Sequence, residues 1–590
     1  MKAFFTKYYV HGSFIICFLL LLWRAFLGFC WTDEAFYIST ADRFLRGDIP
    51  LVDEWFRTQL SSTVMVPFLA LYRMIAGYTG VVLYFRILYL VLSFFVALLW
   101  YRVLSRKYPS HVALFTALVL MCYAHLNNAT FSYYMLSEMF LLAALALIYD
   151  HAAARSRGRL VAAGILLALS VLCMPAFALL VVPAVILAVI VLAAGWLHII
   201  PGKNKERTGN LYLAQITGYT LLGIAIPAVI FSVYLLGHMS ISYLIDTLPV
   251  ALVDNEHTNT FGYYIRKPHR CLTGVFGSWT YVSYLLIAVS FIFQKYLKKR
   301  PYREIVTAAD IVLFAIMAYI SYGHTGYIQV CFFLFFIPLF FISSGKDNVL
   351  FFSSVITSVA VAVIYCFVSS DFLYVMAIGA AVSTGAGICT VYDLVKGDVT
   401  KEGEGSLSPV LSYGLYAVCI VTLAITLFLR MTNVYRDAPV PALTARIDSG
   451  VAKGLYTTPE HLNQYSEVYD VIDKHCSDPH KKVLFSKILP WGYIASASGC
   501  GYPTTWRTTA YDADQLDIYY KMDTTRAPDV IIVLDTTVGS FDASGDVEDD
   551  HEPNLDEMND YLKDYIRDKG MESFRENCAT VYEQVPGSKE

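Results

Sequence analysis

Two adjacent acidic side chains, Asp33 and Glu34, stand directly after the first long apolar stretch of this sequence. A segment that only anchors a chain in a membrane has no use for a carboxylate pair at its end. Two interpretations fit these residue types. Thr32 or Asp33 could cap the N-terminus of a following helix, where negative charge is stabilising. Alternatively, one carboxylate faces a cavity and takes a proton from the hydroxyl of an acceptor molecule.

Two more charged residues interrupt later apolar stretches. Arg86 stands in "LYFRILYLVLSFF" and Glu138 stands in "SYYMLSEMFLLAALAL". Arg86 either extends its guanidinium to the membrane surface or binds an anionic group. A carboxyl group that faces lipid is costly, so we expect Glu138 to point inward, toward a functional cavity.

The composition identifies the environment of most of the chain. Of its 590 residues, 57% are hydrophobic and only 16% are charged, which is typical of a protein that crosses a membrane many times. A helix needs about 20 residues to cross a hydrocarbon layer of about 30 Å. We predict thirteen spanning helices, near 11–30, 81–101, 110–127, 133–150, 160–177, 179–199, 211–236, 272–293, 305–322, 328–344, 349–369, 371–392 and 409–430.

The charge of the loops predicts the orientation of these helices. With the N-terminus in the cytoplasm, the inner loops hold 19 Lys and Arg residues and the outer loops between spans hold seven. The stretch 31–80 and the chain from 431 onward then lie outside. Two segments of that first outer stretch, 33–46 and 61–78, have apolar residues close to helical spacing. They predict helices that lie on the outer membrane surface.

The tail has the composition of a separate, soluble domain. Residues 431–590 hold 15 Lys and Arg against 28 Asp and Glu. A capping signal at Thr458 precedes apolar residues at helical spacing, and the stretches 481–486 and 528–535 read as buried strands. A second helix is expected across 555–566. This mixture predicts a small α/β domain. Its three cysteines, Cys476, Cys500 and Cys578, support no particular disulfide.

A second long outer loop, 237–271, combines turn formers with charges and aromatic residues, and it is long enough to fold over a site. Asp254, Glu256 and His257 within it could bind a divalent metal, because carboxylate and imidazole suit such ions. Their spacing also fits a polar loop tip. A divalent metal is therefore a possible cofactor, and no other cofactor is indicated.

The order of these features resembles that of the GT-C glycosyltransferases, which take sugars from polyprenyl phosphates. One span, an Asp-Glu pair, a long outer loop with surface helices and a span that opens with an arginine follow one another in that family. The protein O-mannosyltransferase and lipid A aminoarabinose transferase group is the most similar branch. The resemblance covers most of residues 1–430. It implies a helical membrane domain over 1–430 with about 13 spans, followed by an extracytoplasmic α/β domain over 431–590.

The resemblance implies roles for the three acids. Asp33 matches the family's catalytic base, and Glu34 is its neighbour. Glu138 matches a further acid that opens the fourth span, although the family more often has Asp there. The sequence "EWFRTQLSSTVMVPF" also lacks the Lys-Pro-Pro run that often follows the first outer helix, and Arg57 and Gln59 occupy that region instead. These departures leave the donor sugar and the acceptor open.

The resemblance likewise implies how the donor is held. Arg86 matches an arginine that contacts the donor phosphate. The leaving phosphate already carries its charge and needs cations rather than a general acid. Further cations for this task come from the second outer loop and are Arg266, Lys267 and Arg270.

The function that follows is an inverting sugar transfer in a bacterial cytoplasmic membrane. The donor would be a polyprenyl-phosphate-linked sugar, and the acceptor would be an extracytoplasmic hydroxyl on a glycolipid, a cell-envelope polysaccharide or a protein. No nucleic-acid partner is expected. One alternative is a transporter or flippase of lipid-linked saccharides, which predicts interrupted helices in matched halves and ionisable residues in span centres. Another is a scaffold with an outer sensory domain, which leaves Asp33, Arg86 and Glu138 without a role.

Overall fold

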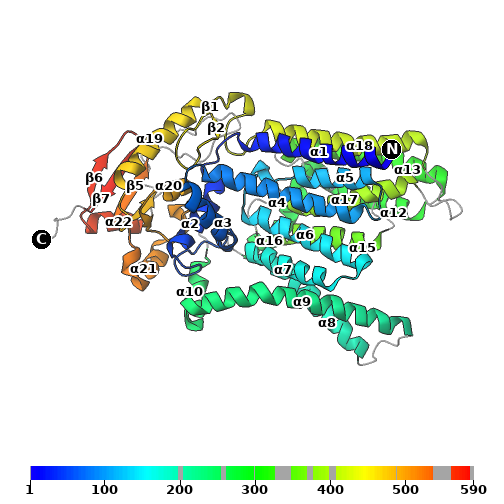
Figure 1. Ribbon diagram of the computed structural model, residues 1–590, viewed down its shortest axis with the longest axis horizontal. Coiled ribbons are helices and arrows are strands. Elements are labelled where there is room, and N and C mark those ends of the chain that lie inside the picture. Colours follow the sequence, from blue (N-terminus) through cyan, green and yellow to red (C-terminus); the bar gives the residue numbers. More distant parts are fainter. Residues whose placement is uncertain are drawn as a thin grey trace.

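The computed structural model describes residues 2–196, 204–253, 261–297, 299–325, 347–368, 376–396, 407–486, 488–535 and 560–584. Long helices run side by side along most of the molecule, and a smaller α/β unit lies at the end away from the N-terminus (Figure 1). Apolar segments become helices in a membrane because a helix satisfies its own backbone groups. By length and composition, seven helices within these ranges could cross a membrane. The chain is thus a helical membrane protein with a small mixed α/β unit.

Each predicted span that falls in the described residues is mostly helical, although the span predicted at 272–293 is divided between the end of one helix and most of the next. The span predicted at 328–344 lies outside the described residues. Residues 197–199, 369 and 371–375 of three other predicted spans lie outside them as well. The number of membrane crossings stays a prediction. The helices are α1 (Lys2–Ala25), α4 (Val81–Leu104), α5 (Ser110–Cys122), α6 (Tyr133–Ala154), α7 (Arg157–Cys173), α8 (Ala178–Trp196), α9 (Asn204–His238), α12 (Thr280–Tyr296), α13 (Arg300–Thr325), α16 (Thr357–Val368), α17 (Met376–Lys396) and α18 (Pro409–Thr432).

Small residues let α7 and α9 approach closely. A Cβ on Gly164 would lie 2.1 Å from the carbonyl oxygen of Thr220, and a Cβ on Gly223 would lie 2.1 Å from that of Val161. Helices in lipid gain most of their mutual stability from close packing, which glycine permits. The two glycines therefore fix the crossing point of these two helices.

The two predicted surface helices form, but they lie in different environments. They are α2 (Asp33–Arg46) and α3 (Leu60–Ala76). Most of α2 is buried, from Glu34 to Arg43, so the prediction that it lies on the membrane surface is wrong. It lies instead between the helical bundle and the α/β unit (Figure 1). By contrast, α3 exposes large apolar side chains, as expected of an interfacial helix, and these include Phe68, Leu71, Met74 and Ile75.

The stretch 237–271 is largely helical where it is described. It contains α10 (Ile241–Ala251) and the start of α11 (Phe261–Phe276), although Pro249 and Pro268 lie inside these helices. The stretch that its turn formers indicate as a loop is thus helical over these parts. A proline inside a helix removes one backbone hydrogen bond, and contacts with neighbouring segments can compensate for this loss.

The α/β unit is built on a five-stranded sheet in the order β4-β3-β5-β7-β6. The strands β4 (Gly499–Cys500), β3 (Lys482–Phe485) and β5 (Val530–Leu534) are parallel, while β7 (Ala579–Glu583) and β6 (Glu572–Arg575) run antiparallel to their neighbours. The predicted strands at 481–486 and 528–535 are confirmed. Every residue of β5 is buried, as expected of a central strand. The short strands β1 (Ala445–Arg446) and β2 (Tyr456–Thr457) pair separately.

Four helices accompany this sheet, and they are α19 (Pro459–His475), α20 (Pro490–Ala495), α21 (Ala513–Met522) and α22 (Asp560–Asp568). The capping prediction for the first of them is confirmed, because the Thr458 side chain accepts a hydrogen bond from the His461 backbone N–H. The helix expected across 555–566 is described only from Asp560. Cys476, Cys500 and Cys578 are free thiols.

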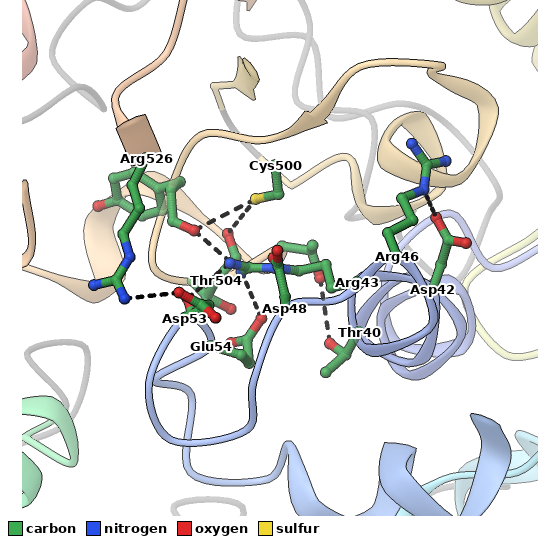
Figure 2. Close-up of polar contacts among 12 residues, drawn as sticks. Thr40, Asp42, Arg43, Arg46, Asp48, Asp53, Glu54, Cys500, Thr504 and Arg526 are labelled. Carbon is green, nitrogen blue, oxygen red and sulfur yellow. Dashed lines mark hydrogen bonds and ion pairs between the residues drawn. The ribbon is translucent and has the colours of Figure 1, made fainter. Parts of the chain in front are cut away.

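The helical bundle and the α/β unit share one packed core. Trp31, just before α2, packs edge-to-face on Trp491 of α20 at a centroid distance of 5.3 Å. Arg43 of α2 forms ion pairs with Asp48 and Glu54 and donates to the Tyr502 carbonyl of the α/β unit (Figure 2). Buried contacts of this kind hold the α/β unit in a fixed position over α2.

Candidate active site

A cavity of about 370 Å³ opens where α2, the start of α6 and the α/β unit meet. It takes residues from eight separate stretches of the chain. One carboxylate, three guanidinium groups and many aromatic rings form its wall. The charged residues are Asp33, Arg57, Arg436 and Arg507, and the aromatic residues are Phe36, Tyr37, Phe56, Tyr133, Tyr134, Tyr435 and Trp506.

Asp33 is held in this wall by the first turn of α2. Its Oδ2 accepts hydrogen bonds from the Tyr435 hydroxyl at 3.0 Å and from the Thr32 hydroxyl at 3.2 Å. The same oxygen lies 2.8 Å from Nη1 of Arg436. The side chain of Asp33 remains 24% exposed, and Thr32 at the cap position makes no side-chain capping bond. Asp33 therefore faces a cavity rather than the end of its own helix.

The hydroxyl of Tyr435 stays protonated beside this carboxylate. Burial, followed by the charge of Asp33, holds the pKa of Tyr435 well above its ordinary value. The pKa of Tyr37, also in the cavity wall, is raised for the same two reasons. Both phenols are thus neutral. Tyr435 already donates its only proton to Asp33, whereas Tyr37 can donate a hydrogen bond to an oxygen in the cavity.

Arg436 is oriented by contacts of its own. Its Nη1 donates to the Thr32 hydroxyl at 2.6 Å, and its guanidinium lies 5.3 Å from the ring centroid of Tyr435. The backbone of Arg436 has φ of 50°, a left-handed conformation that is uncommon for a residue with a side chain. Such strain persists where the surrounding structure requires a particular geometry.

The aromatic wall joins the two parts of the protein. Trp506 of the α/β unit and Phe56 each pack edge-to-face on Phe36 of α2, with centroid distances of 5.2 Å. Arg507 follows Trp506 directly, and its guanidinium lies 5.5 Å from that ring. The α/β unit therefore supplies both a cation and a flat apolar surface to the cavity.

Glu34 and Arg86 lie behind this wall and form a buried ion pair. Nε and Nη2 of Arg86 approach the two carboxylate oxygens of Glu34 at 2.5 and 2.7 Å. Nη1 donates to the carbonyls of Ala25 and Leu27 at 2.8 and 3.1 Å. The Arg86 side chain is 8% exposed and that of Glu34 is 1% exposed. This pair ties the end of α1 and the start of α2 to α4.

Glu138 lies within α6, is fully buried and does not line the cavity of Asp33. The hydroxyl of Tyr123 faces its carboxyl group. Among the residues that the structure describes, no hydrogen bond of good geometry reaches either carboxyl oxygen. The structure thus places Glu138 inside the protein, as predicted, but behind the wall that carries Asp33.

The three cations predicted from the second outer stretch lie on α11. Lys267 is buried and donates to the Phe367 carbonyl at 3.1 Å, next to Val368 in the cavity wall. Arg266 and Arg270 are exposed, and neither lines the cavity. Asp254, Glu256 and His257 lie outside the described residues. Within the described ranges, no group of three or more metal-ligating side chains is present.

Sequence reasoning missed Arg436 and Arg507 as candidate site residues. In the sequence, Arg57 stands out only because it occupies the region of a family motif that this chain lacks. The one local signal for Arg436 is its position just after the last span, in "TNVYRDA", where an arginine would stand at the outer membrane surface. Arg507 in "TTWRTTA" carries no comparable signal, because only the packing of Trp506 on α2 brings it to the cavity.

No protein-family model matches this chain, and no curated protein matches it. Among solved structures, it is similar to the oligosaccharyltransferase AglB from Archaeoglobus fulgidus in complex with an inhibitory peptide and a dolichol phosphate. The identity is 11%, the TM-score is 0.42, and the match covers 99% of this chain and 75% of the other. It is also similar to ArnT from Cupriavidus metallidurans bound to undecaprenyl phosphate, with 13% identity, a TM-score of 0.42 and 98% of both chains covered. The apo form of that ArnT gives 11% identity, a TM-score of 0.42 and 99% of both chains covered. At these TM-scores and identities the likeness does not identify a substrate or a reaction.

Proposed function

We propose that this protein is an inverting glycosyltransferase of the membrane, which moves a sugar from a polyprenyl-phosphate donor to a hydroxyl group outside the cytoplasm. The observation that carries the proposal is the cavity that sets the carboxylate of Asp33 among three arginines and several aromatic rings. One base, several cations for a phosphate and flat apolar surfaces for a sugar ring are the groups that such a transfer needs.

Asp33 is the proposed catalytic base. Its three polar contacts all reach Oδ2, and among the described residues Oδ1 has no hydrogen-bond partner. Oδ1 can therefore accept the proton of an acceptor hydroxyl. The oxygen of that hydroxyl then forms a bond to the anomeric carbon of the sugar, while the bond from that carbon to the phosphate oxygen breaks on the opposite face. The electron pair stays on the leaving phosphate, and the configuration of the sugar inverts.

The leaving phosphate needs cations at the moment the bond breaks. Arg57, Arg436 and Arg507 stand in the cavity wall and are the proposed phosphate-binding residues. Their planar guanidinium groups match the geometry of phosphate oxygens. Lys267, Arg266 and Arg270 stay predictions for the same task, and Lys267 donates to the carbonyl of Phe367, next to the lining residue Val368.

Glu34 and Arg86 are proposed as positioning residues rather than as groups that touch the substrate. The guanidinium of Arg86 is occupied by Glu34 and by two carbonyls, so binding a phosphate would require the pair to open. Intact, the pair fixes the first turn of α2, on which Asp33 stands. Glu138, behind the same wall, stays a predicted second acid of the site.

A panel of donors tests this function. The purified protein, in nanodiscs, is incubated with polyprenyl phosphates carrying different hexoses and pentoses, together with extracts of bacterial glycolipid, cell-envelope polysaccharide and protein as acceptors. Transfer of a radiolabelled sugar from one donor supports the proposal, and the anomeric configuration of the product by NMR decides whether the reaction inverts. A protein that moves these donors across vesicle membranes without transferring the sugar would be a flippase, and the transferase would be excluded.

A further inference from the structure

A second cavity, of about 720 Å³, lies between the C-terminal end of α2, the end of α3 and the α/β unit. It shares no lining residue with the cavity of Asp33. Four cationic side chains and one carboxylate line it, and they are Arg43, Arg46, Arg73, Lys482 and Asp48. The proposed sugar transfer uses none of these residues.

Two of the four cations are structural. Arg43 forms ion pairs with Asp48 at 2.7 Å and with Glu54 at 2.8 Å. Arg46 pairs with Asp42 at 2.6 Å (Figure 2). Its Nη atoms donate to the backbone carbonyls of Ser496, Ala497 and Ser498. These ion pairs neutralise both guanidinium groups, and the contacts fasten the end of α2 to the α/β unit. They form the rigid inner side of the cavity.

The other two cations are not neutralised in this way. Arg73, in the last turn of α3, is exposed, and its guanidinium lies 5.3 Å from the ring centroid of Tyr78. Lys482, at the start of β3, is half-buried. Within the described ranges, neither side chain forms an ion pair with a carboxylate within 4.0 Å. Two positive charges from separate parts of the protein thus face one cavity, where an anion would be attracted.

The absence of a side chain at Gly499 leaves space for the side chain of Lys482. A Cβ on Gly499 would lie 2.9 Å from Nζ and 3.1 Å from Cδ of Lys482. Because glycine has no Cβ, the lysine can lie across β4 with its ammonium group at the cavity. A larger residue at 499 would displace the ammonium group without changing the charge of the protein.

The cavity adjoins a surface that fits a bilayer. Next to Arg73, Met74 and Ile75 are 78% and 77% exposed, and Leu71 of the preceding turn is 51% exposed. A helix that is apolar on its exposed side and ends in an arginine is typical of a segment at the level of lipid headgroups. Basic pockets at this level attract anionic lipids.

We propose that this cavity binds the phosphate headgroup of an anionic membrane lipid, with Arg73 and Lys482 on the phosphate oxygens and the acyl chains beside Leu71, Met74 and Ile75. Binding there would join α3 to the α/β unit through the lipid, so the lipid would fix the α/β unit against the membrane surface. Inorganic phosphate is also an anion but has no acyl chains. Comparing the binding of the two therefore shows whether the cavity binds a lipid or free phosphate.

Native mass spectrometry of the full-length protein in a neutral detergent tests this site. The probes are short-chain phosphatidylglycerol, phosphatidylcholine of equal chain length and inorganic phosphate. We expect phosphatidylglycerol to bind most tightly, and the double variant Arg73→Ala with Lys482→Ala to weaken it by at least about tenfold, as expected for lost charge-assisted hydrogen bonds. The double variant Arg446→Ala with Lys521→Ala removes the same charge at exposed sites and should bind as the wild type does.

Two further variants separate the displacement of Lys482 from a loss of charge, and this site from the proposed transferase site. Gly499→Ala keeps every charge and should weaken phosphatidylglycerol severalfold by displacing Lys482. Asp33→Asn should bind it unchanged, so that failure of the proposed transferase activity and failure of this site are distinguishable. The proposal is overturned if Arg73→Ala with Lys482→Ala binds as the wild type does. Equal binding of phosphatidylcholine, or of inorganic phosphate without chains, also overturns it.

Discussion

The guanidinium of Arg436 lies 2.8 Å from the carboxylate of Asp33, which joins the segment after the last span to the segment after the first. Arg436 also holds the Thr32 hydroxyl, which in turn donates to Asp33. The proposed base is thus oriented by a residue from the far end of the membrane domain. The same arginine lines the cavity in which the donor phosphate would lie.

Replacing Arg436 by Ala should lower kcat/KM for sugar transfer by about ten- to a hundredfold, because charge-assisted hydrogen bonds to both Asp33 and the phosphate are lost. Arg436→Lys should recover part of this loss, since it keeps the charge but not the planar fork. Steady-state kinetics with the donor that the panel experiment identifies measure both. Arg446→Ala, at an exposed site in the α/β unit, is the matched control, and equal rates for Arg436→Ala and that control would remove Arg436 from the mechanism.

The Glu34–Arg86 pair makes a prediction about stability. Changing Arg86 to Met alone leaves a buried, unpaired carboxylate and should reduce the free energy of unfolding by about 3–5 kcal/mol. The double variant Glu34→Leu with Arg86→Met removes both charges and should be more stable than Arg86→Met alone. Thermal denaturation in detergent gives the order of the two. If Arg86→Met keeps the wild-type Tm and instead raises KM for the donor, Arg86 contacts the donor phosphate and is not a positioning residue.

The raised pKa of Glu54 predicts that the stability of the protein depends on pH. Burial raises the pKa of Glu54 to about 7 despite the opposing charge of Arg43. In the unfolded chain this carboxyl titrates near 4.5, so between these two values the folded state binds more protons than the unfolded state. The free energy of unfolding therefore falls as pH rises from about 4.5 to about 7, by up to about 3 kcal/mol, and this contribution is constant above pH 7.

Thermal denaturation of Glu54→Gln across the same pH range checks this expectation. The amide cannot ionise, so the decline of Tm between about pH 4.5 and 7 should be smaller than in the wild type, while Arg43 keeps its partner Asp48. Asp448→Asn, which changes an exposed carboxylate, should retain the wild-type decline. Parallel curves for Glu54→Gln and the wild type would show that Glu54 is ionised throughout.

The close packing of α7 on α9 predicts that a larger residue at Gly164 lowers the stability of the protein, although Gly164 is far from the site. Gly164→Ala places a methyl group where the Thr220 carbonyl oxygen already lies, so the two helix backbones must separate. Overpacking of this kind typically costs about 1–3 kcal/mol. Gly158→Ala, on the same helix but with open space around it, is the control and should be neutral or slightly stabilising. Tm values in detergent compare the two, and equal values would mean that α7 and α9 cross elsewhere.

The helices of the membrane domain were largely predictable, because a long apolar run in a bilayer has few alternatives to a helix. The two strands at 481–486 and 528–535 were predictable as short apolar runs between turn formers. The environment of α2 was not, since its apolar face can cover a membrane or a protein domain equally well, and the sequence pattern does not distinguish them. The helices α10 and α11 were missed because Pro249 and Pro268 suggested a loop, and tertiary contacts outweighed that local preference.

For the site, the sequence indicated Asp33 by its position and by the family resemblance. The cations around it come from 57, 436 and 507, which no local pattern connects. They meet only because Trp506 packs on Phe36 and because the segment after α18 returns to Thr32. Arg86 was predicted from its place at the start of α4, but its buried partner Glu34 could be recognised only from the packed structure.

The most direct test of the central claim is the turnover of Asp33→Asn in nanodiscs with a donor that the wild type uses. The amide keeps the size of the side chain but cannot accept the proton, so the rate of transfer should fall by about 10²–10⁴-fold, the usual contribution of a general base. Binding of the donor and the Tm should stay near the wild-type values, and Asp448→Asn should be fully active. Wild-type turnover in Asp33→Asn would contradict the proposed mechanism.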